Sequence, residues 1–384
     1  MRVYHLIEQW LTTGNTVTFW EITSEEPRGV WGRQGRALRV FSSTALTRLT
    51  RIDKFAAMMS SYPEEVWARA ARDLPEGIQL QDHDVAILMQ PHVGRYAEII
   101  SKSGVPLVLD CQNVEFDAAA RIARVAPRRL SRIRLRVDAL KWKRFERSVA
   151  NAASLVVAVS DHDARQFRGL VDRPVIVHPN GADIAGLPIQ DHHENRFNRI
   201  LMTGTLGYVP NMDAARWMIR EILPTVRQSI PTARLDLVGA APPNWLLKQS
   251  NDAVVVHGNV PDIQPFYEGA DVFVAPLRAG GGTRLKILEA LTIGVPVVST
   301  SLGAAGLKVE DGRHLLLADD AVSFGTAVVR LLTEASLRRR LIDAGRALVE
   351  STYDWRLIAR DYEHDLRAVA GRAETAEPRT PATR

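Results

Sequence analysis

The sequence has a single cysteine, no long apolar run and no cluster of metal ligands. Because Cys111 is the only cysteine, no intrachain disulfide can form, which favours a reducing compartment such as the cytoplasm. No apolar run approaches the roughly 18 residues that a membrane-spanning helix needs. The first residues, MRVYHLIEQW, lack the apolar core of a signal peptide. No Cys or His residues have metal-ligand spacing, so we expect no bound metal.

The composition is that of a soluble globular protein. At 384 residues, with 46% hydrophobic and 24% charged residues, the chain is long enough for two domains with cores of their own. The net charge of +5 favours anionic partners, namely nucleotide phosphates, an anionic membrane surface or nucleic acid. The last residues, 371–384, are rich in Ala, Thr, Pro and charge, and we expect them to be disordered.

Short apolar runs alternate with helical segments through both halves of the chain. This alternation predicts two doubly wound parallel α/β domains, whose ligands bind at the carboxyl ends of the strands. The start is unusual, because a helix at 3–11 precedes the first predicted strand. The other predicted helices of the first half include 62–72 and 93–101. The predicted strands are 17–22, 38–41, 85–89, 105–109, 155–159, 175–177, 200–202, 234–238, 254–257, 271–275, 295–299 and 315–317.

The polar stretch at 183–199 marks the domain boundary. We therefore expect a first domain at 1–184 and a second at 185–354. A final helix is predicted at 355–370, ahead of the disordered tail.

A long basic helical region is predicted at 118–151. It carries eleven Arg or Lys residues between Arg121 and Arg147. One interpretation is a solvated helix face. The other is a basic amphipathic helix that meets anionic lipid head groups or an anionic acceptor. Nucleic acid fits less well, because no RNA-binding signature accompanies the charges.

A glycine-rich motif stands at 279–298, AGGGTRLKILEALTIGVPVV. Glycines ahead of a helix let the backbone approach a ligand closely, and the helix amino terminus attracts anions. Arg284 and Lys286 add positive charge there, although the helix dipole disfavours cations at that end, which favours an anionic ligand. Glu289, further along the helix, can accept hydrogen bonds from sugar hydroxyls. The motif predicts a pocket for a phosphorylated sugar compound.

The second half resembles the donor domain of retaining GT-B-fold glycosyltransferases of family 4, also called glycosyl transferases group 1. The matching segments are TGTLGYVPNMDAARW, RLDLVGAAPP, HGNVPDIQPFYEGADVFVAPLRAGGGTRLKILEALTIGVPVVST and DGRHLLLADD. The first half is similar more loosely, through VLDCQNVEFDAAAR, KRFERSVANAASLVVAVSDHD and HPNGAD. The resemblance implies two Rossmann-like domains facing a cleft and a last helix that returns to the first domain. It also implies hexosyl transfer from a nucleoside-diphosphate sugar to a glycan, lipid-linked or small-molecule acceptor, with retention and without a cofactor or metal.

The resemblance also implies roles for individual residues. Glu289 matches the ribose-binding glutamate, and Lys286 and Arg284 would act on the diphosphate, with Gln112 at the reaction centre. The other donor-binding positions would be Gly204, Thr205, Val260, Gly280, Gly281, Gly282 and Thr283. Asp110 and Asn113 follow a predicted strand and would either line the acceptor side or form a turn.

The chain departs from the family pattern at three points. Gly281 stands where many members have an acid at the sugar, and Gln112 stands where many have a histidine. The usual first strand and glycine-rich loop are missing, which implies either a natural start further upstream or a truncated first domain. Two alternatives to an active transferase therefore remain: a non-catalytic paralogue that binds a nucleotide sugar, and a GT-B-fold nucleotide-sugar epimerase.

Overall fold

The structure is a computed structural model of the chain. It describes residues 2–23, 38–44, 78–125, 129–184, 186–187, 198–280 and 285–375. These residues form two compact units. The first unit comprises Met1–Phe116, Val137–Pro179 and Trp355–Arg384, and the second comprises Asp117–Arg136 and Asn180–Asp354. The predicted helix at 62–72 lies outside the described residues.

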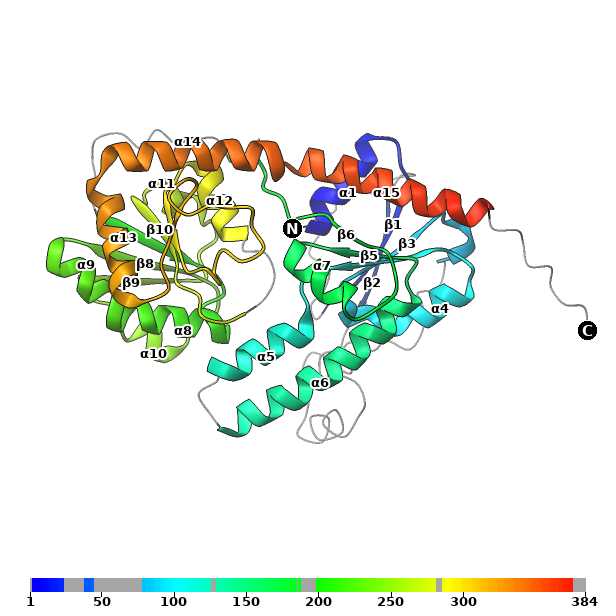
Figure 1. Ribbon diagram of the computed structural model, residues 1–384, viewed down its shortest axis with the longest axis horizontal. Helices are drawn as coiled ribbons and strands as arrows, with labels where there is room; N and C mark the ends of the chain where they lie inside the picture. Colours follow the sequence, from blue (N-terminus) through cyan, green and yellow to red (C-terminus); the bar gives the residue numbers. More distant parts are fainter. Residues whose placement is uncertain are drawn as a thin grey trace, which may run out of the picture. The chain divides into compact units, whose positions relative to one another are not determined.

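The first unit contains two parallel sheets (Figure 1). The chain opens with helix α1, as predicted, before any described strand. A two-stranded sheet pairs β1 with β2, and a four-stranded sheet has the order β3-β4-β5-β6. The strands are β1 (Val17–Thr23), β2 (Leu38–Thr44), β3 (Ala86–Met89), β4 (Leu107–Cys111), β5 (Leu155–Ala158) and β6 (Val175–Val177). The helices that lie wholly in this unit are α1 (Arg2–Thr12), η1 (Leu80–Asp82), η2 (Pro91–Tyr96), α4 (Ala97–Lys102), α7 (Asp161–Arg168) and α15 (Trp355–Thr375). Two further helices, α5 (Glu115–Val125) and α6 (Arg129–Ala152), are divided between the units, because residues 117–136 belong to the second.

Every strand predicted for this half is present. Strands β4 and β5 are buried along their whole length, and β5 is a continuous apolar run in the sequence, as expected of a strand inside a parallel sheet. The region predicted to be helical at 118–151 consists of two helices, α5 and α6. Pro127 lies between them in the sequence, and proline disfavours the interior of a helix. Helix α15 continues to Thr375, beyond the predicted end at 370, so the first residues of the expected tail are helical. Residues 376–384 lie outside the described residues.

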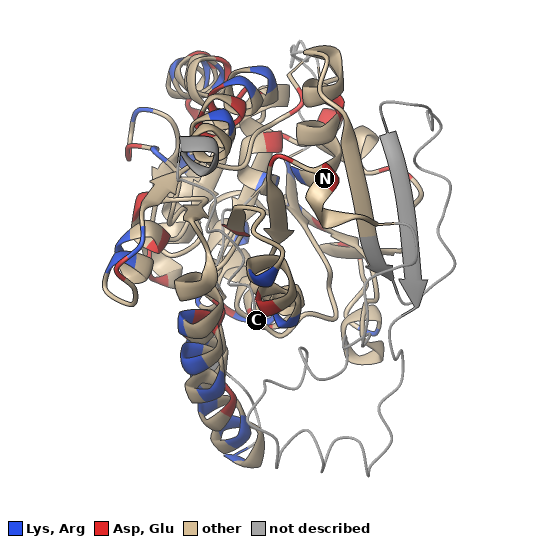
Figure 2. Cartoon of the chain, turned by 90° about the vertical axis from the view of Figure 1, so that its right-hand side faces the viewer, with Lys and Arg blue, Asp and Glu red and all other residues tan. Residues whose placement is uncertain are grey.

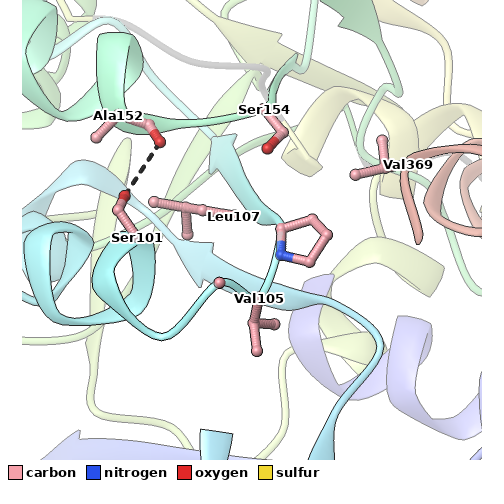
Figure 3. Close-up of a pocket in the computed structure, with 8 residues that line it drawn as sticks. Ser101, Val105, Leu107, Ala152, Ser154 and Val369 are labelled. Carbon is pink, nitrogen blue, oxygen red and sulfur yellow. Dashed lines mark hydrogen bonds between the residues drawn. The ribbon is translucent and has the colours of Figure 1, made fainter. Parts of the chain in front are cut away.

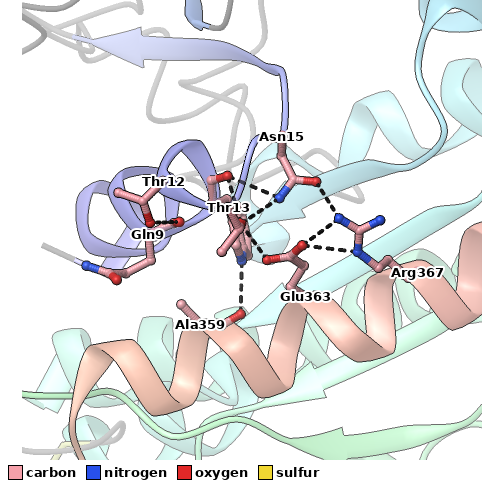
Figure 4. Close-up of polar contacts among 8 residues, drawn as sticks. Gln9, Thr12, Thr13, Asn15, Ala359, Glu363 and Arg367 are labelled. Carbon is pink, nitrogen blue, oxygen red and sulfur yellow. Dashed lines mark hydrogen bonds and ion pairs between the residues drawn. The ribbon is translucent and has the colours of Figure 1, made fainter.

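The first and last described helices pack against each other within the first unit. The Trp10 indole N–H donates to the Ala359 carbonyl at 3.1 Å, and the Thr13 hydroxyl donates to Glu363 at 2.7 Å (Figure 4). Trp10 is buried in a core that α1 and α15 share with β4 and β5. Burial of this apolar surface, more than the exposed polar contacts, fixes α15 to the first unit.

The second unit is a six-stranded parallel sheet with the order β12-β11-β10-β7-β8-β9. Its strands are β7 (Arg199–Thr203), β8 (Arg234–Gly239), β9 (Val254–Gly258), β10 (Val272–Ala275), β11 (Val297–Ser299) and β12 (Leu316–Leu317). Its helices are α8 (Val209–Trp217), η3 (Met218–Ile222), α9 (Leu223–Ser229), α10 (Asn244–Leu247), α11 (Gln264–Glu268), α12 (Leu285–Ile293), α13 (Ala321–Thr333) and α14 (Ala335–Thr352). Two buried apolar clusters pack against this sheet. The doubly wound order places a switch point between β7 and β10, where the chain turns from one side of the sheet to the other.

Candidate functional site

Polar residues gather at the switch point of the second unit, beyond the carboxyl ends of β7 and β10. Strand β7 ends at Thr203, which is followed by Gly204, and helix α12 begins at Leu285. In parallel sheets, ligands bind in the crevice at such a point, because the loops on either side diverge there. Local sequence and topology therefore agree on one place for a site.

Lys286 reaches from the first turn of α12 to the end of β7. Its ammonium group donates to the Thr203 carbonyl at 2.5 Å and to the side-chain carbonyl of Asn211 at 3.2 Å. Asn211 in turn donates to the Thr205 carbonyl at 2.9 Å. These bonds fix a positive charge beside the Gly204–Thr205 turn, at the amino end of a helix where a cation is otherwise unfavourable. A ligand phosphate would relieve that unfavourable placement.

Glu289 lies one turn further along α12 and is held by a buried tyrosine. The Tyr267 hydroxyl donates to one carboxylate oxygen of Glu289 at 3.0 Å and lies 3.1 Å from the hydroxyl of Thr203. Burial raises the pKa of Glu289, while the hydrogen bond from Tyr267 and the charge of Lys286 lower it. A half-buried carboxylate with one oxygen anchored in this way is a fixed acceptor for the hydroxyls of a diol.

Two glycines let the turn after β7 pass close to its neighbours. A Cβ at Gly204 would lie 2.6 Å from the Lys286 ammonium nitrogen, and the residue has φ +142°. A Cβ at Gly239 would lie only 1.7 Å from the carbonyl oxygen of Gly204. No side chain fits at either position, so the backbone itself forms the floor of this site.

The other predicted donor-site residues lie in loops of the second unit or outside the described residues. Thr205 is exposed, Val260 is half-buried after β9, and Gly280 is buried with φ +105°. Gly281, Gly282, Thr283 and Arg284 lie outside the described residues. The structure therefore brings Gly204, Lys286 and Glu289 together at the carboxyl end of β7. The roles assigned to the predicted donor-site residues stay predictions.

In the first unit, Asp110 is part of a buried ion pair. Its side chain is 0% exposed and pairs with Arg2, whose side chain is 1% exposed. Two guanidinium nitrogens of Arg2 donate to one oxygen of Asp110, at 3.0 and 2.9 Å, and a third donates to the Pro179 carbonyl at 2.8 Å. The structure thus shows Asp110 joining α1 to the end of β4, while the predicted acceptor-side role stays a prediction.

Gln112 and Asn113 are half-buried in the loop that follows β4. The loop is held from the other side by Glu146 of α6, whose two carboxylate oxygens accept the backbone N–H groups of Glu115 and Phe116, at 2.8 and 3.0 Å. This carboxylate caps the amino end of α5. Burial raises the pKa of Glu146 to about 8, although the two backbone hydrogen bonds lower it.

A cavity of about 340 Å³ opens at the opposite end of β4 (Figure 3). Its lining residues come from the start of that strand, from the ends of α4 and α6, and from α15. Among them are Val105, Leu107 and Val369, with Ser101 and Ser154 as the polar members. Because Gln112 and Asn113 follow the carboxyl end of β4, this cavity is separate from the predicted acceptor residues.

The described residues form neither a metal-ligand cluster nor a membrane-spanning helix. They contain no group of three or more His, Cys, Asp and Glu side chains that could hold a metal ion. No helix in the described part of the chain is long and apolar enough to cross a membrane. That the reaction needs no metal or cofactor stays a prediction.

Sequence reasoning missed three residues of the second-unit site, namely Thr203, Asn211 and Tyr267. Thr203 could have been found, because it lies directly between the predicted strand 200–202 and Gly204. Asn211 and Tyr267 gave no usable signal, because polar and aromatic residues on short helices occur for many structural reasons. Only the folded chain shows that they contact Lys286 and Glu289.

Residues 197–334 match the family model described as Glycosyl transferases group 1. A phosphatidyl-myo-inositol mannosyltransferase of Mycobacterium leprae is 28% identical over 213 residues, which are 53% of this chain and 56% of that relative. The chain spans about half the length of the curated relatives it matches, from 42% to 60%.

Similar solved structures extend over more of the chain. Sucrose-phosphate synthase from Thermosynechococcus elongatus superposes with a TM-score of 0.70 at 17% identity, covering 96% of this chain and 93% of that one. HepE of Anabaena, solved in complex with UDP-glucose, gives a TM-score of 0.59 at 18% identity, covering 87% of this chain and 86% of that one. The predicted fold class, two Rossmann-like α/β domains of the GT-B type, is confirmed.

Proposed function

We propose, from the premise that residues 197–334 are a group 1 glycosyl transferase domain, that the protein moves a hexosyl group from a nucleoside-diphosphate sugar to an acceptor hydroxyl, with retention. The observation that carries the proposal is the placement of Lys286 and Glu289 on one helix, with Lys286 bonded to the end of β7 and Glu289 held by Tyr267. A fixed cation and a fixed carboxylate on one helix match the two ends of such a donor, its diphosphate and its ribose diol. The UDP-glucose complex of HepE supports this class of ligand.

The proposed chemistry is a substitution at the anomeric carbon of the donor sugar. The bond from that carbon to the β-phosphate oxygen breaks, and a bond to the acceptor oxygen forms on the same face. The acceptor proton passes to the departing phosphate, which leaves as part of a nucleoside diphosphate. Negative charge grows on that phosphate in the transition state, so the preorganised charge of Lys286 and the backbone N–H groups beside Gly204 would stabilise it.

The acceptor belongs to the same proposal. A glycan, a lipid-linked sugar or a small molecule would present the hydroxyl to the loop after β4, where Gln112 and Asn113 lie. Both are amides that can hydrogen-bond a hydroxyl without exchanging a proton with it at neutral pH. The phosphatidyl-inositol acceptor in the name of the mycobacterial relatives supports an acceptor at a membrane surface.

We place the protein in the cytoplasm, in peripheral contact with an anionic membrane through the basic region 121–147. The lone cysteine favours a reducing compartment. Basic residues near a cytoplasmic leaflet each contribute about 1 kcal/mol of attraction to anionic lipids. Most of this region lies on α5 and α6, whose charged side chains are spread along a solvent-facing surface.

The test is donor binding to the full chain, measured as thermal shift with UDP-, GDP-, ADP- and dTDP-sugars. Lys286→Met and Glu289→Gln should each weaken binding of the preferred donor at least about tenfold, because each removes a charged partner. Lys308→Met and Glu310→Gln are matched controls, since both residues are exposed in the same unit. Unchanged donor affinity in Lys286→Met and Glu289→Gln would rule out this site.

Turnover separates the proposal from its alternatives. Incubation of the wild-type chain with the donor and candidate acceptors should release the nucleoside diphosphate. Conversion of the sugar in the absence of any acceptor would indicate an epimerase. Donor binding without turnover on any acceptor would indicate a non-catalytic binder.

A further inference from the structure

Helix α6 exposes an apolar stripe that no described residue covers. Four of the eight large apolar side chains that are exposed among the described residues lie on this one helix. They are Leu130 (82% exposed), Ile133 (52%), Val137 (46%) and Leu140 (65%). Exposed apolar residues scattered singly need no explanation, but four on one helix form a patch that does.

The four residues lie on one face of the helix. Their steps along the sequence are three, four and three residues, which return to the same side of an α-helix. The carboxyl half of α6 is buried through a different set, Trp142, Phe145, Glu146, Val149 and Ala150. At 100° per residue, this buried face and the apolar stripe lie on roughly opposite sides of the helix axis. The stripe is therefore not the edge of the core.

Basic residues border the stripe on both sides. Arg129, Arg136 and Lys143 follow one edge, and Arg134 and Lys141 follow the other, by the same helical geometry. Asp138 is the only acid from 129 to 145. Figure 2 shows the Lys and Arg positions as bands along α6, the lowest helix in that view. An apolar face bordered by cations is the pattern of a helix that lies in a membrane interface.

We infer that the apolar stripe of α6 inserts into the interface of an anionic membrane while the flanking Arg and Lys residues bind the lipid head groups. The inference rests on the proposed membrane contact, and it assigns that contact to one helix face and to insertion as well as to charge. Electrostatics favours a lipid surface over a second copy of the chain as the partner of the stripe. A second copy paired along the stripe would bring basic edges against basic edges, and like charges at that range repel.

The experiment uses the full chain with vesicles of phosphatidylcholine alone and of phosphatidylcholine with about one third phosphatidylglycerol. The wild-type chain should sediment with the anionic vesicles and only weakly with the neutral ones. The double variant Leu130→Ser/Leu140→Ser should bind the anionic vesicles at least about tenfold more weakly, because it removes the two most exposed apolar side chains of the stripe. Val322→Ser is the matched control, since Val322 is 67% exposed on α13, and it should bind like the wild type.

Site-specific labelling reports insertion directly. The only natural cysteine, Cys111, is buried, so a cysteine introduced by Leu140→Cys can be labelled selectively with an environment-sensitive dye. Its emission should shift to the blue with anionic vesicles, and a label introduced through Val322→Cys should not shift.

Several outcomes would overturn the inference. The first is a wild-type chain that does not bind anionic vesicles. The second is a double variant that binds them as tightly as the wild type, and the third is a label at position 140 whose emission does not shift. A wild-type dimer that the double variant converts to a monomer would instead assign the stripe to self-association. Donor thermal shifts recorded on the same variants keep this result separate from the sugar-transfer proposal, because the stripe substitutions should leave donor affinity unchanged.

Discussion

Replacing Arg2 with methionine should strongly destabilise the first unit. Arg2→Met removes three hydrogen bonds from a side chain that is 1% exposed and leaves the carboxylate of Asp110 buried at 0% exposure without its cation. One oxygen of Asp110 already has no hydrogen-bond partner among the described residues, and the other accepts both of its hydrogen bonds from the Arg2 guanidinium. Breaking a buried pair from one side typically costs about 3–5 kcal/mol, mainly through the uncompensated charge.

Calorimetry of the full chain is the suitable assay, because two units need not unfold in one transition. For a unit of this size the expected loss corresponds to a fall of about 6–20 °C in the transition of the first unit. The double variant Arg2→Met/Asp110→Leu should recover most of the loss, since no charge is then left buried. A single variant within about 1 kcal/mol of the wild type, which is the value of a surface pair, would refute the reasoning.

The same pair of variants separates two roles for Asp110. If Asp110 only joins α1 to β4, the stable double variant should keep its transfer activity. A stable but inactive double variant would favour the acceptor-side role that the sequence predicted.

Three further predictions concern single substitutions elsewhere in the two units. Tyr267→Phe removes a hydrogen bond that lowers the pKa of Glu289, so donor affinity should fall about tenfold. The loss of affinity should be larger at pH 6 than at pH 8, because Glu289 is then more easily protonated. Binding titrations that give equal losses at both pH values would contradict this. Because burial raises the pKa of Glu146 to about 8 from 4.5, the folded state holds the extra proton between these values. The unfolding free energy should therefore fall as pH rises from about 4.5 to about 8, and Glu146→Gln should flatten that slope in melting curves. Gly239→Ala would place a Cβ 1.7 Å from the carbonyl oxygen of Gly204. The free energy of unfolding, measured with denaturant, should therefore fall by about 3–5 kcal/mol. A fall below about 1 kcal/mol would contradict this reasoning.

The strands were predictable because parallel strands buried on both faces carry a local signal. Runs such as 155–159 are apolar at every position, and β5 is buried throughout. Helix boundaries were less predictable. The region 118–151 has a helical period throughout, and only Pro127 indicated that it forms two helices.

The candidate site was predictable where its residues share one motif. Lys286 and Glu289 stand three positions apart after a run of glycines, so one short segment placed both. The partners that hold them were not predictable. Tyr267 is 22 positions from Glu289, and Asn211 is 75 positions from Lys286, separations at which helix or strand periodicity gives no information.

By itself, the sequence determined the alternation of strands and helices, the glycine-rich motif at 279–298 and the basic character of 121–147. Each of these features depends on residues that are close together in the sequence, through hydrophobic periodicity, glycine spacing and charge. Only the tertiary structure decided that Arg2 neutralises Asp110 across 108 positions, that Tyr267 holds Glu289, and that α6 turns one apolar face inward and another outward. The physical reason is that burial and charge pairing depend on which distant segments the packed sheets bring together.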